Sequence, residues 1–429
     1  MRVLFVSNLY PPNVVGGYER LCFNVAAAFA ARGHDVAVLA SGHGGRTAEY
    51  PGQRVRRTLR LLAGETVYAP FAGDAPARDA LNRANLAALA EAVREERPDV
   101  VFAWNLFFLD RSLLEALGGC GVPVAAMLTD NWLAEMVRPG FNTAFFRDHV
   151  FGSVPFPQEP APAPKSGFLV RLLGQRGEAP AREPGLHLPM AAVFGADFVR
   201  AYYDAAGIRF ARHRVVHNGV PQESLPDAAF RDRTRLVRDG ELRLLFAGRL
   251  VDLKGADTAV EALPLLLAAE AAELAGLEAR LTVVGDGQDV AYVRRLHEAI
   301  ARSGCADRIE LRPSVPEAAL FDLFQDHDIY LFPSLYEPFS LTLIHALACG
   351  IPTVASSAGG NREIVRDGES GVVFEKGSAD GLARAVRRLA ADPALRARVA
   401  RGGRDAAARF TFEAMVEGLE AFLRDDRRG

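Results

Sequence analysis

The sequence predicts two α/β domains, each organised around a doubly wound parallel sheet. Short apolar runs alternate with helical patterns, and this alternation occurs twice, on either side of a polar stretch. The length of 429 residues agrees with this prediction, because one ordinary hydrophobic core does not extend over a chain of that size. Ligands of such folds bind at the carboxyl ends of the strands, so the search for chemistry starts there.

The first alternation predicts a βαβ unit followed by further buried strands. The helical segment 16–35 carries Leu21, Val25 and Phe29 on one face, and Gly33 suits its C-terminal end. The apolar runs predicted as strands are RVLFVS (2–7), DVAVLA (35–40), DVVFAW (99–104) and VPVAAML (122–128).

The second alternation predicts a second domain with its own sheet. Its predicted strands are LRLLFAG (242–248), ARLTVVG (279–285), RIELRP (308–313), DIYLFPS (328–334), IPTVAS (351–356) and GVVFE (371–375). The polar segment 218–240 contains two prolines and lacks a long apolar run, so we place the domain boundary near residue 225. The expected division is an N-terminal domain at 1–225, a C-terminal domain at 226–408 and a final helix within 409–429.

A proline-rich segment at 151–190 interrupts the first domain. A long connection of this kind inside a compact domain is typical of a functional loop or an insertion, and we expect it to be mobile. Its core GFLVRLLGQR (167–176) suits either a short amphipathic helix that meets an acceptor or a membrane, or a solvated loop. The prolines are Pro155, Pro157, Pro160, Pro162, Pro164, Pro180, Pro184 and Pro189.

Composition excludes several classes of protein. A hydrophobic content of 49% with 24% charged residues is typical of a globular protein, and a net charge of −3 gives no general attraction to nucleic acid. The four cysteines are scattered and show neither disulfide nor metal-ligand spacing. No apolar run reaches the roughly 18 residues of a membrane span, and the N-terminus starts directly as a strand. We therefore expect a cytoplasmic protein, with contact at the inner membrane face left open.

Three elements at predicted strand ends suit an oxygen-rich or anionic ligand. Gly16 and Gly17 precede a helix, where a backbone without Cβ atoms lets a ligand approach free N–H groups; a bare turn explains them nearly as well. In GRLVDLKG (248–255), Arg249 and Lys254 combine a guanidinium fork with a movable ammonium, which suits a diphosphate; a solvated surface pair is the alternative.

The third element is SLYEPFSLTLIHALACG (334–350). Ser340 is expected to cap a helix from Leu341 to about Gly350, whose first N–H groups then face the ligand. Glu337 precedes that helix and suits hydrogen bonds from sugar hydroxyls, or simply favours the helix dipole. His345 lies inside the apolar helix, where a satisfied core histidine is the alternative to a ligand contact.

These segments together resemble the family-4 retaining glycosyltransferases of the GT-B fold. The resemblance rests on PPNVVGGYERLCFNVAAAFAARGHDVAVL (11–39), VVHNGVP (215–221), GRLVDLKGADTAVEAL (248–263), VVGDGQD (283–289) and PSLYEPFSLTLIHALACGIPTVASSAGGNREIVRDGESGVVF (333–374), in that order. It is strongest at about 240–375 and over the first 40 residues. It implies two Rossmann-like domains facing across a cleft that holds a nucleoside diphosphate sugar, with the last helix crossing back to the first domain.

The resemblance also implies roles for individual residues. Arg249 and Lys254 would hold the diphosphate, together with the amides of Leu341 and Thr342. Glu337, Phe339 and Ser340 would contact the transferred sugar, and Ser340 stands where the family often has glycine. Gly16 and Gly17 would contact the phosphate or the sugar. Gly285 and Gly287 would leave space for the nucleotide.

Two positions depart from the family pattern. His345 occupies the place of the second of two glutamates, which usually grips the ribose diol, and an imidazole cannot grip two hydroxyls as a carboxylate does. We therefore expect an altered or weaker ribose contact. In MLTDNWLAEM (127–136), Thr129 stands where many relatives have a histidine, and we consider Asp130 as a substitute on the acceptor side.

The implied reaction is sugar transfer with retention from a UDP-, GDP-, ADP- or dTDP-sugar to a hydroxyl of a glycan, a lipid or a small metabolite. No cofactor and no metal are expected, since two cations face the diphosphate. Two alternatives stay open: a nucleotide-sugar epimerase or hydrolase of the same architecture, and a non-catalytic nucleotide-sugar-binding partner subunit. A dinucleotide oxidoreductase is disfavoured, because no Gly-x-Gly-x-x-Gly follows the first strand.

Overall fold

The computed structural model describes residues 1–14, 16–67, 69–152, 156, 185–221, 230–268, 276–316 and 319–426. The chain forms two compact units. Unit 1 comprises Met1–His217 and Met415–Gly429, and unit 2 comprises Asn218–Ala414.

Unit 1 contains a parallel sheet that has seven strands in its described part, in the order β3-β2-β1-β4-β5-β6-β7. The order reverses beside β1, so the sheet is doubly wound and its switch point lies between β1 and β4. Its strands are β1 (Arg2–Val6), β2 (Asp35–Ser41), β3 (Gln53–Leu59), β4 (Val100–Ala103), β5 (Val124–Leu128), β6 (Leu186–Phe194) and β7 (Ile208–Val215).

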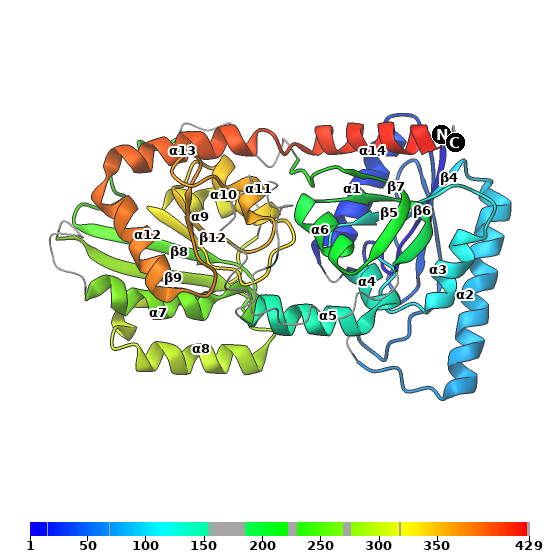
Figure 1. Ribbon diagram of the computed structural model, residues 1–429, viewed down its shortest axis with the longest axis horizontal. Helices are drawn as coiled ribbons and strands as arrows, with labels where there is room; N and C mark the ends of the chain where they lie inside the picture. Colours follow the sequence, from blue (N-terminus) through cyan, green and yellow to red (C-terminus); the bar gives the residue numbers. More distant parts are fainter. Residues whose placement is uncertain are drawn as a thin grey trace, which may run out of the picture. The chain divides into compact units, whose positions relative to one another are not determined.

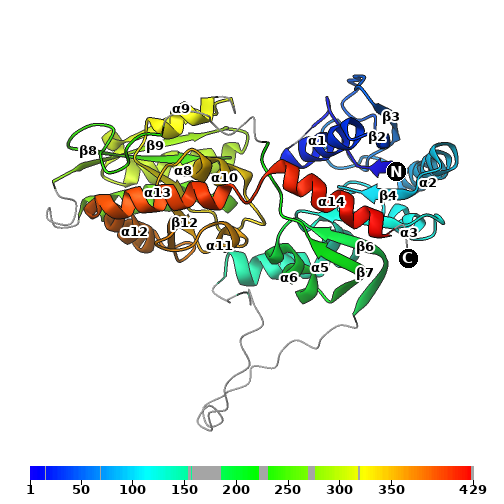
Figure 2. The ribbon, with the colours of Figure 1, turned by 90° about the horizontal axis from the view of Figure 1, so that it is seen from above.

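Helices accompany this sheet, and the C-terminal helix is one of them. Glu420 of α14 accepts hydrogen bonds from Arg32 (3.0 Å) and pairs with His34 (2.9 Å), so α14 lies beside the end of α1 (Figures 1 and 2). The guanidinium of Arg212 on β7 lies 4.0 Å from the ring centroid of Phe422. The helices are α1 (Gly17–Ala31), α2 (Ala75–Glu96), α3 (Arg111–Gly118), α4 (Trp132–Val137), α5 (Pro139–Phe145), the π-helical turn η1 (Phe146–Val150), α6 (Asp197–Ala205) and α14 (Phe412–Asp426).

Unit 2 repeats the architecture with six parallel strands among its described residues, in the order β10-β9-β8-β11-β12-β13. All of β11 and β12 is buried, as expected for strands covered on both faces. Its strands are β8 (Glu241–Ala247), β9 (Glu278–Gly285), β10 (Ile309–Pro313), β11 (Ile329–Phe332), β12 (Thr353–Ser356) and β13 (Val372–Phe374).

Two layers of helices cover the sheet of unit 2. On one face, α7 packs against α8, α12 and β9, while α10 packs against α13 on the other (Figure 1). The core between sheet and helices is aliphatic and includes Leu244, Leu263, Leu331 and Leu389. The helices are α7 (Ala256–Leu267), α8 (Val290–Arg302), α9 (Leu320–Gln325), α10 (Leu341–Ala348), α11 (Asn361–Ile364), α12 (Ala379–Ala391) and α13 (Pro393–Ala407), with 3₁₀ turns η4 (Asp252–Lys254) and η5 (Ala306–Arg308).

The predicted fold class is confirmed, and every strand that the sequence predicted is present within a few residues. The prediction missed β3, β6 and β7. In β3 (QRVRRTL) and β7 (IRFARHRV) basic residues break the apolar run, because these two strands form the edges of the sheet and are only partly buried. β6 contains Pro189, next to an irregularity in its register with β7.

Two further expectations differ from the structure or lie outside it. Residues 186–190 of the expected insertion belong to β6, whereas 153–155 and 157–184, including the possible helix at 167–176, lie outside the described residues. The change of unit falls between His217 and Asn218 rather than near 225. Val220 explains this, since it forms a β-bridge with Thr411 and already belongs to the packing of unit 2.

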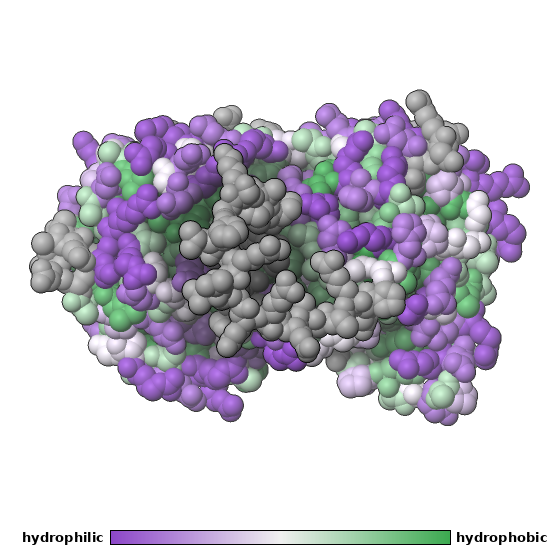
Figure 3. Space-filling view, viewed as in Figure 1, coloured by the Kyte–Doolittle hydropathy of each residue, from purple (hydrophilic) through white to green (hydrophobic). Residues whose placement is uncertain are grey.

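The described helices include none that is long and apolar enough to cross a membrane. On the face shown in Figure 3, hydrophilic side chains are interspersed with smaller groups of hydrophobic ones.

Candidate functional site

The candidate site in unit 2 centres on an ion pair. Lys254 Nζ lies 2.5 Å from Glu337 Oε2, and their side chains are 21% and 7% exposed. Lys254 ends η4, after β8, and Glu337 lies in the loop between β11 and α10. Because β8 and β11 are parallel neighbours, their carboxyl ends meet at one edge of the sheet, which brings the two predicted residues together.

Close backbone packing holds the two loops of this pair against each other. The N–H of Leu335 donates to the carbonyl of Leu253 (2.9 Å), and Gly255 adopts a left-handed conformation with φ +68°. A Cβ atom on Gly255 would lie 2.3 Å from the carbonyl oxygen of Pro333. Glycine is therefore required after Lys254, and the side chain of Lys254 is delivered to Glu337 by a fixed backbone.

The loop that carries Glu337 is fixed from its other side by two glycines, Gly359 and Gly360, which were not among the predicted site residues. The N–H of Gly360 donates to the carbonyl of Glu337 (2.9 Å), and Gly359 has φ +54°. Cβ atoms on Gly359 and Gly360 would lie 2.0 Å from Glu337 O and 2.3 Å from Pro338 O. Two adjacent glycines after the predicted strand 351–356 were the available signal.

Helix α10 begins as predicted. The Ser340 hydroxyl accepts a hydrogen bond from the Leu343 N–H (3.1 Å), which is an N-cap, so serine in place of glycine supports the helix start. Leu341, Thr342 and His345 are partly exposed, while Leu343 and Ile344 are buried. His345 therefore shares the outward face of α10 with the two residues whose amides were predicted to bind phosphate. It is not a fully buried core histidine.

The remaining predicted site residues of unit 2 differ in how accessible they are to a ligand. Arg249 follows β8 and is exposed. A Cβ on Gly285 would lie 2.3 Å from the carbonyl of Gly248, so packing of the chain itself explains that glycine. A Cβ on Gly287 would meet no described atom within 4 Å, which leaves its backbone accessible. Phe339 is 7% exposed and packs edge-on against Phe410, with ring centroids 5.3 Å apart.

In unit 1, Gly16 and Gly17 start α1 as predicted. Gly16 has φ −157°, which any residue adopts, and a Cβ on Gly17 would meet no described atom within 4 Å. The turn therefore does not itself require these glycines. The Gly16 N–H donates to Glu19 Oε2 (2.9 Å), whereas the Gly17 amide belongs to the first turn of α1, whose N–H groups have no acceptor within the helix. With the carboxylate of Glu19 in the first turn, this position favours sugar hydroxyls over a phosphate.

A chain of polar contacts joins the start of α1 to Asp130. The Tyr18 hydroxyl donates to the carbonyl of Met127 at the end of β5, and the Trp132 indole N–H donates to the Tyr18 oxygen (3.1 Å). The Trp132 backbone N–H donates to Asp130 Oδ1 (3.0 Å). These hydrogen bonds place the start of α1, with Gly16 and Gly17, close to Asp130, although the two segments are far apart in the sequence.

Burial raises the pKa of Asp130 to about 6, and the charge of Glu19 adds to the rise, while the hydrogen bond from Trp132 opposes it. A carboxyl group with that pKa exchanges a proton near neutral pH. Asp130 is therefore chemically suited to the acceptor-side role that was predicted for it, in which it substitutes for the histidine that many relatives have at position 129.

Comparison with known proteins gives two family matches that follow the two units. Residues 15–224 match Glycosyltransferase Family 4, and residues 229–406 match Glycosyl transferases group 1. A glycogen synthase of Mycobacterium tuberculosis is 30% identical over 424 residues, covering 94% of this chain and 89% of that protein. A D-inositol 3-phosphate glycosyltransferase of Streptomyces bingchenggensis is 37% identical over 223 residues, 50% of this chain. That match spans about half of the relative, 48% of its length.

Solved structures share the fold. Sucrose-phosphate synthase from Thermosynechococcus elongatus superposes with a TM-score of 0.69 at 18% identity, covering 99% of this chain and 98% of that one. Anabaena HepE, solved in complex with UDP and glucose, superposes with a TM-score of 0.63 at 18% identity and 99% coverage of both chains. At this identity the likeness establishes the fold, which is that of the GT-B glycosyltransferases expected from the sequence.

Proposed function

This chain belongs to glycosyltransferase family 4, and we propose that it transfers a sugar from a nucleoside diphosphate sugar to an acceptor hydroxyl with retention at the anomeric carbon. The observation that carries the proposal is the Lys254–Glu337 pair at the carboxyl ends of β8 and β11. A cation for the diphosphate and a carboxylate for sugar hydroxyls meet there, and a nucleotide sugar presents those two groups next to each other.

In the proposed donor complex, Lys254 moves from Glu337 to the diphosphate, joined by Arg249 and by the amides of Leu341 and Thr342. The freed carboxylate of Glu337 then accepts hydrogen bonds from the sugar. His345 lies on the same outward face of α10 and takes the ribose contact, with one imidazole nitrogen in place of a two-oxygen grip. The backbone at Gly287 leaves space for the nucleotide.

The reaction breaks the bond between the anomeric carbon and the leaving phosphate oxygen. A new bond forms from the anomeric carbon to the acceptor oxygen on the same face, and the acceptor proton passes to the leaving phosphate oxygen. Negative charge grows on the diphosphate as the bond breaks, so Arg249 and Lys254 stabilise the transition state more than the ground state. Asp130 is proposed to hydrogen-bond the acceptor.

We propose that the reaction needs no divalent metal, because these cations already face the diphosphate. Transfer measured in EDTA and in added Mg²⁺ tests this point. Equal rates support the proposal, and activity that disappears in EDTA contradicts it.

Donor and acceptor are left to a screen. Since HepE was solved with UDP and glucose, UDP-sugars are the first donors to test, followed by GDP-, ADP- and dTDP-sugars. The acceptor is a glycan, a lipid or a small metabolite. The proposed location is the cytoplasm, and contact with the inner membrane face is proposed only for a lipid acceptor. The transfer is tested by incubating each donor with an acceptor library and identifying the product and its anomeric configuration.

A second candidate is a non-catalytic nucleotide-sugar-binding subunit, and His345 and Thr129 are the observations that favour it. The same screen separates the two. A subunit of that kind binds the donor through Arg249 but does not consume the donor with any acceptor. A hydrolase or epimerase of this architecture consumes the donor when no acceptor is present.

A further inference from the structure

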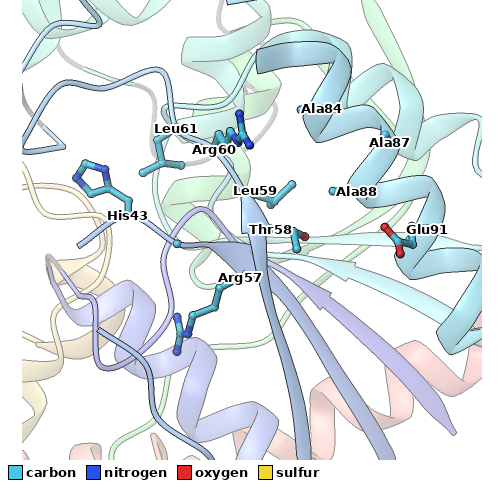
Figure 4. Close-up of a pocket in the computed structure, with 11 residues that line it drawn as sticks. His43, Arg57, Thr58, Leu59, Arg60, Leu61, Ala84, Ala87, Ala88 and Glu91 are labelled. Atoms are coloured by element: carbon cyan, nitrogen blue, oxygen red, sulfur yellow. The ribbon is translucent and has the colours of Figure 1, made fainter. Parts of the chain in front are cut away.

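A cavity of about 750 Å³ lies within unit 1, between the edge strand β3 and helix α2 (Figure 4). The end of β3 and the two residues after it supply the lining residues 57–61, and Gly42 and His43 follow β2. The α2 side is shallow because Ala84, Ala87 and Ala88 carry no side chain beyond Cβ. The volume falls in the range of about 300–1,000 Å³ that is typical of small-molecule sites.

The wall of this cavity is fixed at Arg60. Asn85 on α2 is 2% exposed, its Oδ1 accepts the Arg60 N–H (2.8 Å), and its Nδ2 donates to the Arg60 carbonyl (2.9 Å). A buried amide therefore clamps the backbone of Arg60 to α2. The backbone that carries the Arg60 side chain therefore does not have to be ordered when a ligand arrives, which reduces the entropic cost of binding.

The arginines of β3 differ in their partners. Arg54 pairs with Asp35 (2.6 Å) and Arg56 with Glu95 (2.6 Å), while Arg57 donates to the Tyr10 carbonyl (3.0 Å). Among the described contacts, the guanidinium of Arg60 has no ion pair or hydrogen bond, although it lines the cavity together with His43 and Glu91.

The chemistry of the lining specifies the class of ligand. A guanidinium fork binds a phosphate or carboxylate through two parallel hydrogen bonds, and an imidazole adds a donor. Glu91 enters from α2, beyond Ala87 and Ala88, where an acceptor of hydroxyl hydrogen bonds suits a polyol (Figure 4). We propose that this cavity binds a small organic anion, a phosphate or carboxylate on a hydroxylated body, with its charged group on Arg60 and His43 and a hydroxyl on Glu91.

Binding at this cavity is independent of the transfer reaction, since it needs no turnover. It is measured by isothermal titration of the full chain with inorganic phosphate, glucose 6-phosphate and glucuronate, with glucose as the uncharged match. The titrations are repeated in the Arg249→Ala background, which removes a cation of the proposed donor site. Anion binding that persists in this background is assigned to unit 1, and this assignment holds whether or not the proposed donor site binds a nucleotide sugar.

Three variants test the geometry. Arg60→Gln removes the free guanidinium, and we expect it to weaken binding of the anionic ligand about tenfold or more, as for loss of a charge-assisted hydrogen bond. Ala87→Leu adds volume at an exposed helical position, and we expect a similar loss without a change in charge. Arg83→Gln is the control, because Arg83 is an exposed arginine of α2 outside the cavity lining, and we expect no effect.

The proposal is overturned if none of the three anions binds, if glucose binds as tightly as glucose 6-phosphate, or if Arg60→Gln and Arg83→Gln behave alike. Two sources share this ligand chemistry, the acceptor of the proposed transfer and a regulatory metabolite. A glycosylated product formed from the bound anion supports the cavity as an acceptor site. A changed rate of donor turnover without that product supports it as an effector site.

Discussion

Lys254 and Glu337 form an ion pair with an Nζ–Oε2 distance of 2.5 Å, although 83 positions separate them in the sequence. A carboxylate that is only 7% exposed loses much of its hydration and needs a nearby positive charge. Nucleotide-sugar binding would exchange this internal contact for two contacts with the ligand. The ion pair therefore compensates both charged groups within the protein itself.

Separate replacement of the two partners distinguishes their roles. Lys254→Met removes the cation for the diphosphate, so we expect about tenfold or greater loss of affinity for both UDP and the UDP-sugar. Glu337→Gln removes a contact to the sugar and releases Lys254 from its ion pair, so we expect weaker binding of the UDP-sugar and unchanged or tighter binding of UDP. Isothermal titration measures all four affinities. Equal losses for UDP and UDP-sugar in Glu337→Gln would place that carboxylate away from the sugar.

Glycine replacements separate a structural glycine from an accessible one. At Gly359 an added Cβ lies 2.0 Å from the carbonyl of Glu337 and φ is +54°, so we expect Gly359→Ala to lower the free energy of unfolding by about 2 kcal/mol or more. Gly287→Ala meets no described atom within 4 Å and should leave stability within about 0.5 kcal/mol while weakening donor binding. Urea denaturation followed by circular dichroism measures both. Unchanged donor affinity in Gly287→Ala would remove that residue from the nucleotide site.

Replacement of His345 tests whether this histidine, which stands where the family has a second glutamate, contacts the ribose. It lies on the partly exposed face of α10, so His345→Glu should fold normally and restore a two-oxygen grip on the ribose diol. We expect a several-fold gain in nucleotide-sugar affinity, and His345→Ala should bind no better than the wild type. The comparison is made by titration with one nucleotide sugar. Identical affinities in the wild type and His345→Glu would mean that position 345 does not contact the ribose.

Asp130 predicts a pH dependence of stability. Its pKa rises from 3.8 to about 6 on folding, so the folded protein binds more protons than the unfolded chain between these values, and this group's contribution to stability declines as pH rises through that window. Asp130→Asn cannot titrate. Its free energy of unfolding should rise relative to that of the wild type by on the order of 2 kcal/mol between pH 4.5 and 7.

Tryptophan fluorescence during urea denaturation is the appropriate probe, because both tryptophans, Trp104 and Trp132, belong to unit 1. The Trp132 N–H keeps an oxygen acceptor in Asp130→Asn, which limits other effects of the change. If the free energies of unfolding of the wild type and Asp130→Asn differ by a constant amount across this pH window, the pKa of Asp130 is not raised.

The sequence predicts most of the strands because a strand buried on both faces must be a continuous apolar run, as in β11 and β12. The same rule hides β3, where five of seven residues are arginine, glutamine or threonine, and so hides the wall of the cavity beside it. Lys254 and Glu337 come together predictably, since carboxyl ends of parallel strands meet. The adjacent glycines Gly359 and Gly360 indicate a turn or a close backbone approach, but their partner, the Glu337 loop, is not predictable, because a close backbone approach leaves no periodic pattern.

Titration of the full chain with UDP-, GDP-, ADP- and dTDP-sugars, in the wild type, in Arg249→Ala and in Arg294→Ala, tests the central claim most directly. Arg294 is an exposed arginine of α8 and controls for the loss of one positive charge. The account predicts selective binding of one nucleotide sugar that is lost in Arg249→Ala and preserved in Arg294→Ala. Folded wild-type protein that binds no nucleotide sugar, or binds it equally in Arg249→Ala, would contradict it.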